Sequence, residues 1–336
     1  NILTNIIAIS NRFESTENDT VFTWLPHTHD MGMFAQHLTP VKNGCNIMVF
    51  SPFTFVRSPY MFLKKITEHK GTWFCATNFG YDWMTRKISD DKLASLDLSS
   101  LRFVANGAEP ISTLVIDNFV KKFSKCGFRE NMMKPAYGMA EATVGVTMPK
   151  IGTPVRVERI CRTKMINENI VATVENNNET DKIEFVHEGH PFDGVDVRIA
   201  DENGNTLDEY MIGEIQIRGN NVTSGYYNND EATKDLFIDG WLRTGDLGFM
   251  ADSSLVVSGR IKDVIFVRGQ NYFAHDLEEI IYELDTIDRG NIALVGHFNS
   301  KTQQEELLAF IKYKSSIEKF LPLRKSIIDK LHEALG

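Results

Sequence analysis

The sequence has few cysteines, and their spacing argues against a protein held together by disulfides. Only 4 of the 336 residues are cysteine, and they are far apart: Cys45, Cys75, Cys126 and Cys161. None forms a Cys-x-x-Cys pair, so no zinc motif is indicated either. Four cysteines are enough for two disulfides, but a chain with this much core does not need them. We expect free thiols in a reducing cytosol.

Excess basic charge and long apolar runs are also missing. Lys and Arg number 36 against 45 Asp and Glu, whereas a nucleic-acid surface needs clustered Lys and Arg. No apolar run reaches the roughly 18 residues that span a bilayer. Residues 1–13 lack the charged and then apolar pattern of a signal peptide. We therefore expect a cytoplasmic protein with no nucleic-acid partner and no transmembrane segment.

The patterns that are present predict an α/β fold with more than one domain. The length exceeds that of a usual single core, and 42% of the residues are hydrophobic. Apolar runs over 1–150 predict buried strands, as at 44–50, and they alternate with helical patterns, as at 58–71. Such alternation predicts a largely parallel sheet.

One helix is expected over 111–127, where Leu114, Phe119 and Phe123 are spaced for a single apolar face. Further along, alternating runs predict antiparallel strands or a small β-barrel-like subdomain. In one of these runs Ile215 and Ile217 face opposite to Gln216 and Arg218.

The alternation of strands and helices returns near the C-terminus and predicts a small, mobile α+β domain. A final helix is expected over 316–335, where Ile327, Ile328, Leu331 and Leu335 share one apolar face.

We expect a large domain over 1–258, a hinge at 259–263 and the small domain over 264–336. Within the large domain we expect an α/β part (1–150), a polar excursion (151–187) and an antiparallel part (188–258).

A carboxylate between two glycines, Asp246 in WLRTGDLGFM, is the first candidate for ligand binding. A carboxylate accepts two hydrogen bonds, which matches the vicinal diol of a ribose. Gly245 and Gly248 remove side chains that would hold a ligand away. A hairpin between these residues and Arg260 would bring Arg260 near Asp246, as a second donor to ribose or phosphate. The alternatives are a turn aspartate and a surface salt bridge.

Two further motifs follow expected strands in the first half, NGAEP (106–110) and YGMAEAT (137–143). The carboxyl ends of parallel strands are where ligands bind in open sheets. Tyr137 offers a flat face for a base, and Glu141 is a candidate ligand for Mg²⁺. Alternatively, Glu141 is a first-turn helix carboxylate favoured by the macrodipole.

The stretch WLPHTHDMG (24–32) places His27, His29 and Asp30 in an apolar setting. The His-x-His-Asp pattern suggests a metal site. No further ligands at a recognisable spacing accompany it, so loop residues are the stronger interpretation.

In this order the segments resemble the adenylate-forming superfamily of acyl and aminoacyl ligases, almost from end to end. Within it the chain is most similar to the fatty acyl-AMP ligases. The resemblance is carried by WLPHTHDMG, LDLSSLRFVANGAEP, YGMAEAT, RTGDLGF and GRIKDVIFVRGQN. Such ligases carry an extra segment where this chain has 151–187, so the excursion is expected to be their insertion.

The resemblance implies a role for each matched residue. The nucleotide-binding residues would be Asn106, Gly107, Ala108, Glu109, Tyr137, Gly138, Asp246 and Arg260. Among them, Tyr137 would stack on adenine and Asp246 would hold the ribose. The residues with catalytic roles would be Glu141, which binds Mg²⁺, and Lys262, about which the small domain turns. The acyl site would be bordered by His29, Asp30, Asn78, Phe79 and Gly80.

The implied activity is activation of a medium- or long-chain fatty acid by ATP and Mg²⁺. Acyl-AMP and pyrophosphate would form, and the acyl group would pass to an acyl carrier protein or to the carrier domain of a polyketide or nonribosomal synthase. A fatty acyl-CoA ligase is the nearest alternative. The family's phosphate loop and a distal catalytic lysine find no match in this sequence. A non-catalytic nucleotide- or acyl-adenylate-binding fragment is therefore the alternative from another class.

Overall fold

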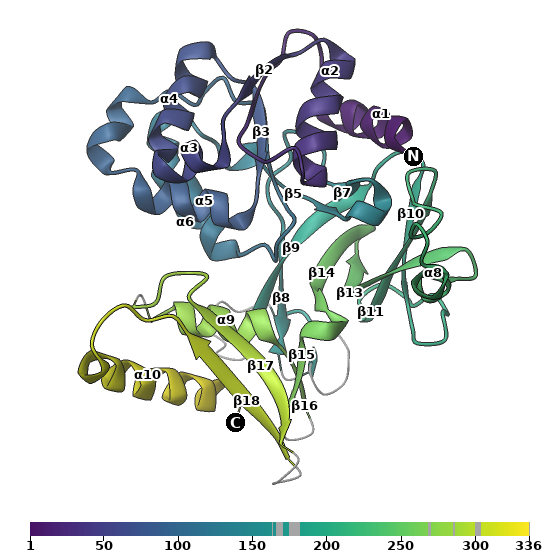
Figure 1. The fold of residues 1–336 in the computed structure, drawn as a ribbon, viewed down its shortest axis with the longest axis vertical. Coiled ribbons are helices and arrows are strands. Elements are labelled where there is room, and N and C mark those ends of the chain that lie inside the picture. Colours follow the sequence, from purple (N-terminus) through teal and green to yellow (C-terminus); the bar gives the residue numbers. More distant parts are fainter. Residues whose placement is uncertain are drawn as a thin grey trace. The chain divides into compact units, whose positions relative to one another are not determined.

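The computed structural model of the chain describes residues 1–162, 164–165, 171–174, 182–267, 270–284, 286–299 and 304–335. The chain divides into two compact units (Figure 1). The first comprises Asn1–Glu158, Glu184–Thr244 and Gly248–Val257, and the second comprises Arg159–Ile183, Gly245–Leu247 and Ser258–Gly336. Part of the predicted polar excursion 151–187, namely residues 163, 166–170 and 175–181, lies outside the described residues.

A parallel sheet forms the centre of the first unit, as the sequence predicts. Its described strands run in the order β2-β1-β3-β4-β5, with bounds β1 Thr20–Thr23, β2 Asn46–Val49, β3 Trp73–Ala76, β4 Phe103–Asn106 and β5 Met133–Pro135. Strands β3 and β4 are buried throughout. Strand β2 has exposed ends, so the prediction of a buried strand at 44–50 is wrong. It lies at the sheet edge, where β1 covers one side only.

Helices cover both faces of this sheet (Figure 1). One side carries α4 (Pro59–His69), α5 (Asn78–Lys87) and α6 (Thr113–Phe123), and the other carries α1 (Ile2–Phe13) and α2 (Thr39–Asn43). The remaining helical segments of this part are η1 (Met31–Leu38, a π-helix), α3 (Pro52–Arg57), η2 (Asp90–Ser95), η3 (Ser124–Cys126) and η4 (Glu130–Met132).

The apolar face of α6 differs from the predicted face at one position. Val115, Ile116, Phe119 and Phe123 are buried, whereas Leu114 is 45% exposed. Ser112 caps the helix by accepting from the backbone N–H of Val115. The buried stripe runs through 115, 116, 119 and 123, and Leu114 lies outside it because successive residues are about 100° apart.

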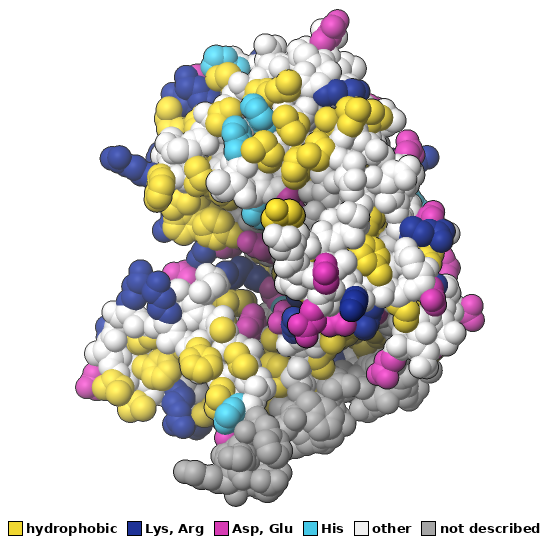
Figure 2. All heavy atoms as spheres, turned by 45° about the vertical axis from the view of Figure 1, so that its right-hand side comes forward, with side chains coloured by type: hydrophobic (Ala, Val, Ile, Leu, Met, Phe, Trp, Pro, Cys, Tyr) yellow, Lys and Arg dark blue, Asp and Glu magenta, His cyan; other side chains and the backbone are white. Residues whose placement is uncertain are grey.

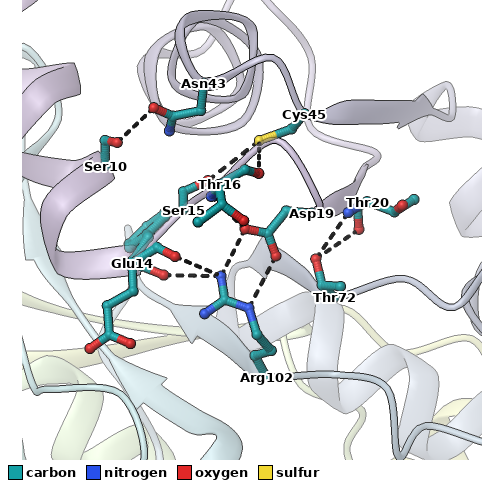
Figure 3. A network of polar contacts seen from close by, with 11 residues as sticks. Ser10, Glu14, Ser15, Thr16, Asp19, Thr20, Asn43, Cys45, Thr72 and Arg102 are labelled. Carbon is teal, nitrogen blue, oxygen red and sulfur yellow. Dashed lines mark hydrogen bonds and ion pairs between the residues drawn. The ribbon is translucent and has the colours of Figure 1, made fainter.

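An ion pair joins the end of α1 to the starts of β1 and β4 (Figure 3). Arg102 donates from both Nε and Nη2 to the buried carboxylate of Asp19, at 3.0 and 2.9 Å. The same guanidinium donates to the carbonyl of Phe13 at 3.1 Å. Asp19 Oδ2 also accepts from the backbone N–H of Thr16 at 2.9 Å. The loop after α1 is therefore held by one bidentate pair.

The chain from 137 to 260 forms a second, antiparallel sheet. Its described strands run β10-β11-β13-β14-β9-β7-β6, with β12 beside β13 and β8 beside β9. The bounds are β6 Tyr137–Gly138, β7 Gly145–Met148, β8 Val157–Cys161, β9 Lys182–Pro191, β10 Val195–Ala200, β11 Gly213–Gly219, β12 Phe237–Ile238, β13 Trp241–Ala251 and β14 Ser254–Arg260. Two short helical segments accompany them, η5 (Ala140–Ala142) and α8 (Asp230–Leu236).

Strand β11 differs from the predicted alternation because its polar face is covered. Gln216 is only 1% exposed. Its Oε1 accepts two hydrogen bonds from Arg198, at 3.0 and 2.7 Å. The Arg198 guanidinium in turn lies 4.5 Å from the ring centre of Trp241, a cation–π contact.

The C-terminal elements of the second unit have a core of their own. They are η6 (Ile261–Asp263), β15 (Val264–Val267), β16 (Gln270–Phe273), α9 (Ala274–Tyr282), β17 (Ile292–Asn299), β18 (Gln304–Ile311) and α10 (Ile317–Leu335). Ile327 and Leu331 of α10 pack with Leu277 and Ile281 of α9 in this core. The predicted final helix at 316–335 and its apolar face are thus confirmed.

On the visible surface, hydrophobic side chains and histidines gather over the N-terminal α/β part of the first unit (Figure 2). None of the helices in the described part of the chain combines the length and apolar character needed to cross a membrane. The four cysteines are free. Burial raises the pKa of the Cys45, Cys75 and Cys126 thiols.

Candidate functional site

Three of the predicted site residues meet at the carboxyl edge of the parallel sheet. Asn106 ends β4, Asn78 follows β3, and Tyr137 follows β5. The backbone N–H of Gly107 donates to the carbonyl of Ala76 at 3.3 Å, and that of Ala136 donates to the carbonyl of Asn106 at 2.8 Å. The strand ends are therefore in register, because parallel strands end on the same edge.

Asn106 is fully buried and leaves one acceptor unsatisfied. Its Nδ2 donates to Asn78 Oδ1 at 3.4 Å, and that oxygen also accepts from the backbone N–H of Ser112 at 3.3 Å. Within the described residues, Asn106 Oδ1 has no hydrogen-bond partner. A buried orphan acceptor costs about 1–3 kcal/mol. A ligand that brings an N–H or O–H group would recover that free energy.

Two glycines at this edge allow a close backbone approach. A Cβ on Gly107 would lie 2.5 Å from the carbonyl oxygen of Ala136. A Cβ on Gly138 would lie 1.8 Å from the carbonyl oxygen of Val144. Neither position tolerates a side chain, so the spacing of these segments depends on glycine.

The other predicted nucleotide-binding residues of this part differ in exposure. Tyr137 is 8% exposed, whereas Ala108 and Glu109 are exposed. Ala108 has a left-handed backbone, with φ at +67°. Glu109 Oε2 accepts from the backbone N–H of Phe79 at 2.9 Å. The NGAEP turn is thereby linked to the start of α5.

Glu141 lies in η5 and is held by a tyrosine distant in sequence. Its Oε1 accepts from the Tyr226 hydroxyl at 2.7 Å. This hydrogen bond, together with burial, raises the pKa of Tyr226 to about 12. The segment η5 has only three residues. Glu141 does lie in the first turn of this helical segment, but three residues contribute only a small macrodipole.

Glu141 is the carboxylate predicted to bind Mg²⁺, and such a cation would be surrounded only partly by protein ligands. In the described portion of the chain, no group of three or more His, Cys, Asp or Glu side chains could hold a metal ion. Mg²⁺ usually keeps waters and substrate phosphates and takes only one or two carboxylates. Glu141 fits this arrangement as a single carboxylate.

Two of the segments that carry predicted acyl-site residues meet at Trp24 and Gly80. The His29 Nδ1 atom lies 2.7 Å from Asp30 Oδ1, and Asp30 caps η1 by accepting from the backbone N–H of Met31. A Cβ on Gly80 would lie 2.9 Å from Cζ2 of Trp24. The segments 24–32 and 78–80 are therefore in contact.

Two contacts between aromatic rings at these segments could not be predicted from the spacing of the residues in the sequence. Trp24 stacks on Phe55 with ring centres 4.1 Å apart. The rings of His27 and His37 are 4.5 Å apart. His37 lies in the π-helix η1, and the His-x-His-Asp pattern at 27–30 does not predict its contact with His27. On the other side of the predicted site, Phe79 is 40% exposed and stacks on Trp83 at 5.6 Å.

Asp246 and Arg260 form a pair in the second unit. Arg260 Nε donates to Asp246 Oδ1 at 2.9 Å, and the side chain of Asp246 is 9% exposed against 69% for Arg260. Strands β13 and β14 are neighbours in the sheet, so the predicted hairpin that returns Arg260 to Asp246 is confirmed. The pair presents one buried carboxylate and one exposed cation.

The two glycines beside Asp246 have different roles. Gly245 has φ at +73° and open space around its missing Cβ, as a ligand-accessible turn requires. A Cβ on Gly248 would lie 2.4 Å from the carbonyl oxygen of Val256. The interpretation of Gly248 as an opening for a ligand is therefore wrong, because the neighbouring strand occupies that space. Lys262, in η6, is exposed.

Comparison with known proteins agrees with this geometry. Residues 1–227 match the family model described as AMP-binding enzyme, and the chain belongs to this family. It is 34% identical over 290 residues to a medium-chain-fatty-acid–[acyl-carrier-protein] ligase, JamA, of Moorena producens. That match covers 83% of this chain and 48% of the relative.

A further relative and a solved structure are also named as ligases of fatty acids. The long-chain-fatty-acid–AMP ligase FadD23 of Mycobacterium tuberculosis is 32% identical over 288 residues, which are 82% of this chain and 48% of that protein. A solved structure from a study of fatty acyl-adenylate ligases of E. coli and L. pneumophila superposes with a TM-score of 0.92 and 29% identity. It covers all of this chain and 60% of its own. The chain spans about half the length of the curated relatives it matches.

Proposed function

We propose that the protein activates a medium- or long-chain fatty acid with ATP, forms acyl-AMP and releases pyrophosphate, for transfer to an acyl carrier protein. The observation that carries the proposal is the buried orphan oxygen of Asn106 beside Tyr137 at the carboxyl edge of the sheet. Similarity to proteins named as fatty-acid–carrier-protein and fatty-acid–AMP ligases supports the substrate class.

In the proposed reaction a fatty carboxylate oxygen attacks the α-phosphorus of ATP. A P–O bond forms, and the bond to the β,γ-phosphates breaks to release pyrophosphate. Glu141 would hold Mg²⁺, which offsets the repulsion between the two anions. Tyr137 would stack on adenine, and Asn106 would accept a hydrogen bond from the nucleotide. Asp246 would accept hydrogen bonds from the ribose hydroxyls.

The acyl chain would bind along Trp24, Gly80 and the residues around His29 and Asp30. Each buried methylene contributes about 0.8 kcal/mol, so an apolar site favours longer chains. The contact of Trp24 with Gly80 supports this placement.

We also propose the domain organisation that the sequence predicts, with a large domain over 1–258, a hinge at 259–263 containing Lys262, and a small mobile domain over 264–336. Turning about the hinge would exchange the residues that face the acyl adenylate before transfer. A cytoplasmic location is proposed with it, because the reaction consumes ATP.

Carrier protein is proposed as the acceptor in preference to CoA because the excursion 151–187 is tied to the small domain. Arg162 Nη2 donates to Asp276 Oδ1 of α9 at 2.9 Å, with side-chain exposures of 13% and 9%. A buried pair that loses one partner leaves an uncompensated charge. Because both residues belong to the second unit, the excursion is expected to move with the small domain, and we propose that it hinders CoA more than a carrier protein.

ATP–pyrophosphate exchange by the full-length protein tests the activity. Exchange is expected with at least one fatty acid of about C8 to C18, a range in which each added methylene strengthens binding. Absence of exchange across the whole series would refute it.

Product analysis with CoA and with a phosphopantetheinylated carrier protein tests the acceptor. Acyl-carrier protein is expected as the main product. Efficient acyl-CoA formation would identify an acyl-CoA ligase instead. Arg162→Ala is expected to increase the CoA product relative to wild type.

A further inference from the structure

We propose that Tyr226 is a positioning residue that orients the Glu141 carboxylate for its cation. The inference rests on the proposed role of Glu141 but assigns a function to a residue for which the sequence motifs predicted no role. Tyr226 lies 85 positions from Glu141 along the chain. Both residues belong to the first unit.

The loop that carries Tyr226 is fastened to the segment that carries Glu141. The backbone N–H of Thr223 donates to the carbonyl of Glu141 at 2.7 Å. Asn221, which is 1% exposed, donates from Nδ2 to the carbonyl of Ala142 at 3.0 Å. In the opposite direction, the Thr143 hydroxyl donates to the carbonyl of Asn221 at 2.9 Å. Three contacts on consecutive residues fix the two segments against each other.

The backbone at this junction is strained, which argues for a specific purpose. Thr143 has φ at +73°, a region that a β-branched residue rarely adopts and that costs about 1–3 kcal/mol. The contact with Asn221 holds Thr143 in this conformation. Strain of this kind persists only when the surrounding contacts over-determine it.

Tyr226 itself is held from its other end by a tight turn. Its backbone N–H donates to the Thr233 hydroxyl at 2.9 Å. Gly225 has φ at +144°, and a Cβ there would lie 2.5 Å from Cγ2 of Thr233. The ring is therefore fixed at its base, while its hydroxyl reaches Glu141 Oε1 at 2.7 Å.

The consequence for the carboxylate follows from this geometry. A hydroxyl-to-carboxylate hydrogen bond of this length is charge-assisted and directional. It restrains the rotation of the Glu141 side chain, so the carboxylate is ordered before a cation binds. Because less entropy is then lost on binding, the cation binds more tightly. The hydroxyl remains bonded in the bound state and does not compete for the site.

Tyr226→Phe in the full-length protein tests the inference, with Tyr227→Phe as the matched control. Tyr227 is the adjacent tyrosine and is 94% exposed. The readout is Mn²⁺ binding followed by EPR in the presence of a non-hydrolysable ATP analogue. Loss of one hydrogen bond is expected to weaken Mn²⁺ binding by about 3- to 10-fold. Tyr227→Phe is expected to leave it unchanged.

A double variant separates positioning from a merely structural effect. In the Glu141→Gln background, Tyr226→Phe is expected to cause no further loss of Mn²⁺ affinity, because it acts through the carboxylate. Equal Mn²⁺ affinity in Tyr226→Phe and wild type would overturn the inference, and so would tighter binding, which would mean that the hydroxyl competes with the cation. A similar loss in the Glu141→Gln background would also overturn it.

The EPR measurement needs no fatty acid, so its outcome is separate from that of the pyrophosphate exchange. Tyr226-dependent Mn²⁺ binding without exchange would retain the inference and refute the ligase proposal. Pyrophosphate exchange by the wild-type protein, with no effect of Tyr226→Phe on Mn²⁺ binding, would support the ligase proposal and overturn the inference about Tyr226.

Discussion

Arg260 Nε donates to Asp246 Oδ1 at 2.9 Å across the β13–β14 hairpin, and the two side chains differ sharply in exposure. The carboxylate is nearly buried while the guanidinium remains in solvent. Arg260 thus partly neutralises Asp246 without enclosing it. Because the carboxylate is nearly buried, the pair is not the fully exposed salt bridge that would contribute little to stability. We propose that it binds a polar ligand.

Asp246→Ala is expected to weaken binding of a non-hydrolysable ATP analogue by about 10-fold or more, because hydrogen bonds to a charged group are lost. Calorimetric titration of the full-length protein measures this. Asp239→Asn is the matched control, since Asp239 is exposed and its left-handed backbone, with φ at +49°, suits asparagine. Unchanged affinity in Asp246→Ala would exclude the ribose role.

Glu141→Gln is expected to raise the Mg²⁺ concentration for half-maximal pyrophosphate exchange by about 10-fold, because a hard cation prefers an anionic oxygen. The substitution keeps the size of the side chain and an acceptor for Tyr226. Glu231→Gln serves as the control, because Glu231 is exposed in the first turn of α8. An identical Mg²⁺ titration in Glu141→Gln and wild type would contradict the assignment.

Lys134→Met is expected to stabilise the protein at neutral pH. Lys134 is fully buried in β5 and donates to the carbonyl of Thr153. Burial lowers its pKa from 10.5 to about 8. Between these values the unfolded chain binds more protons than the folded one, so wild-type stability rises with pH. The variant should be more stable by about 1–3 kcal/mol below pH 8.

The pH dependence of this difference is the decisive measurement. The advantage of Lys134→Met should shrink as the pH rises from 8 toward 10.5, the two values that bound the shift. Urea unfolding at several pH values measures it. Lys125→Met, at an exposed position, should show no such trend. A pH-independent difference would mean that Lys134 does not titrate as its burial implies.

Arg102→Ala is expected to lower the free energy of unfolding by about 2–4 kcal/mol, because the buried Asp19 carboxylate would lose its bidentate partner. Arg57→Ala, at an exposed position, should have little effect. In an Asp19→Asn background the cost of Arg102→Ala should fall, since no buried charge is then left behind. An equal cost in both backgrounds would show that the ion pair is unimportant.

Local features of this fold could be predicted from the sequence wherever the determining contacts are close in the chain. The parallel sheet, the final helix and the return of Arg260 to Asp246 all depend on periodicity or on a short hairpin. Individual exposures were less predictable. Leu114 is exposed because it lies outside the stripe of Val115, Ile116, Phe119 and Phe123 that packs against the core. Gln216 is buried because Arg198 and Trp241 cover it.

Contacts between distant segments could not be predicted. No period in the sequence relates Tyr226 to Glu141, or Arg102 to Asp19, because these pairs exist only after the sheets have formed. The orphan oxygen of Asn106 is likewise a property of packing. NGAEP indicates where a ligand could bind, but the missing partner is seen only in three dimensions.

The burial of the cysteines has a chemical consequence for the proposed reaction. An acyl adenylate is an electrophile that a thiolate attacks, and only the ionised form of a cysteine is a good nucleophile. Because burial raises the pKa of Cys45, Cys75 and Cys126, less of each thiol is ionised at neutral pH than in an exposed cysteine. In the proposed reaction these three sulfurs would therefore accept the acyl group less readily than the exposed thiol of an acceptor.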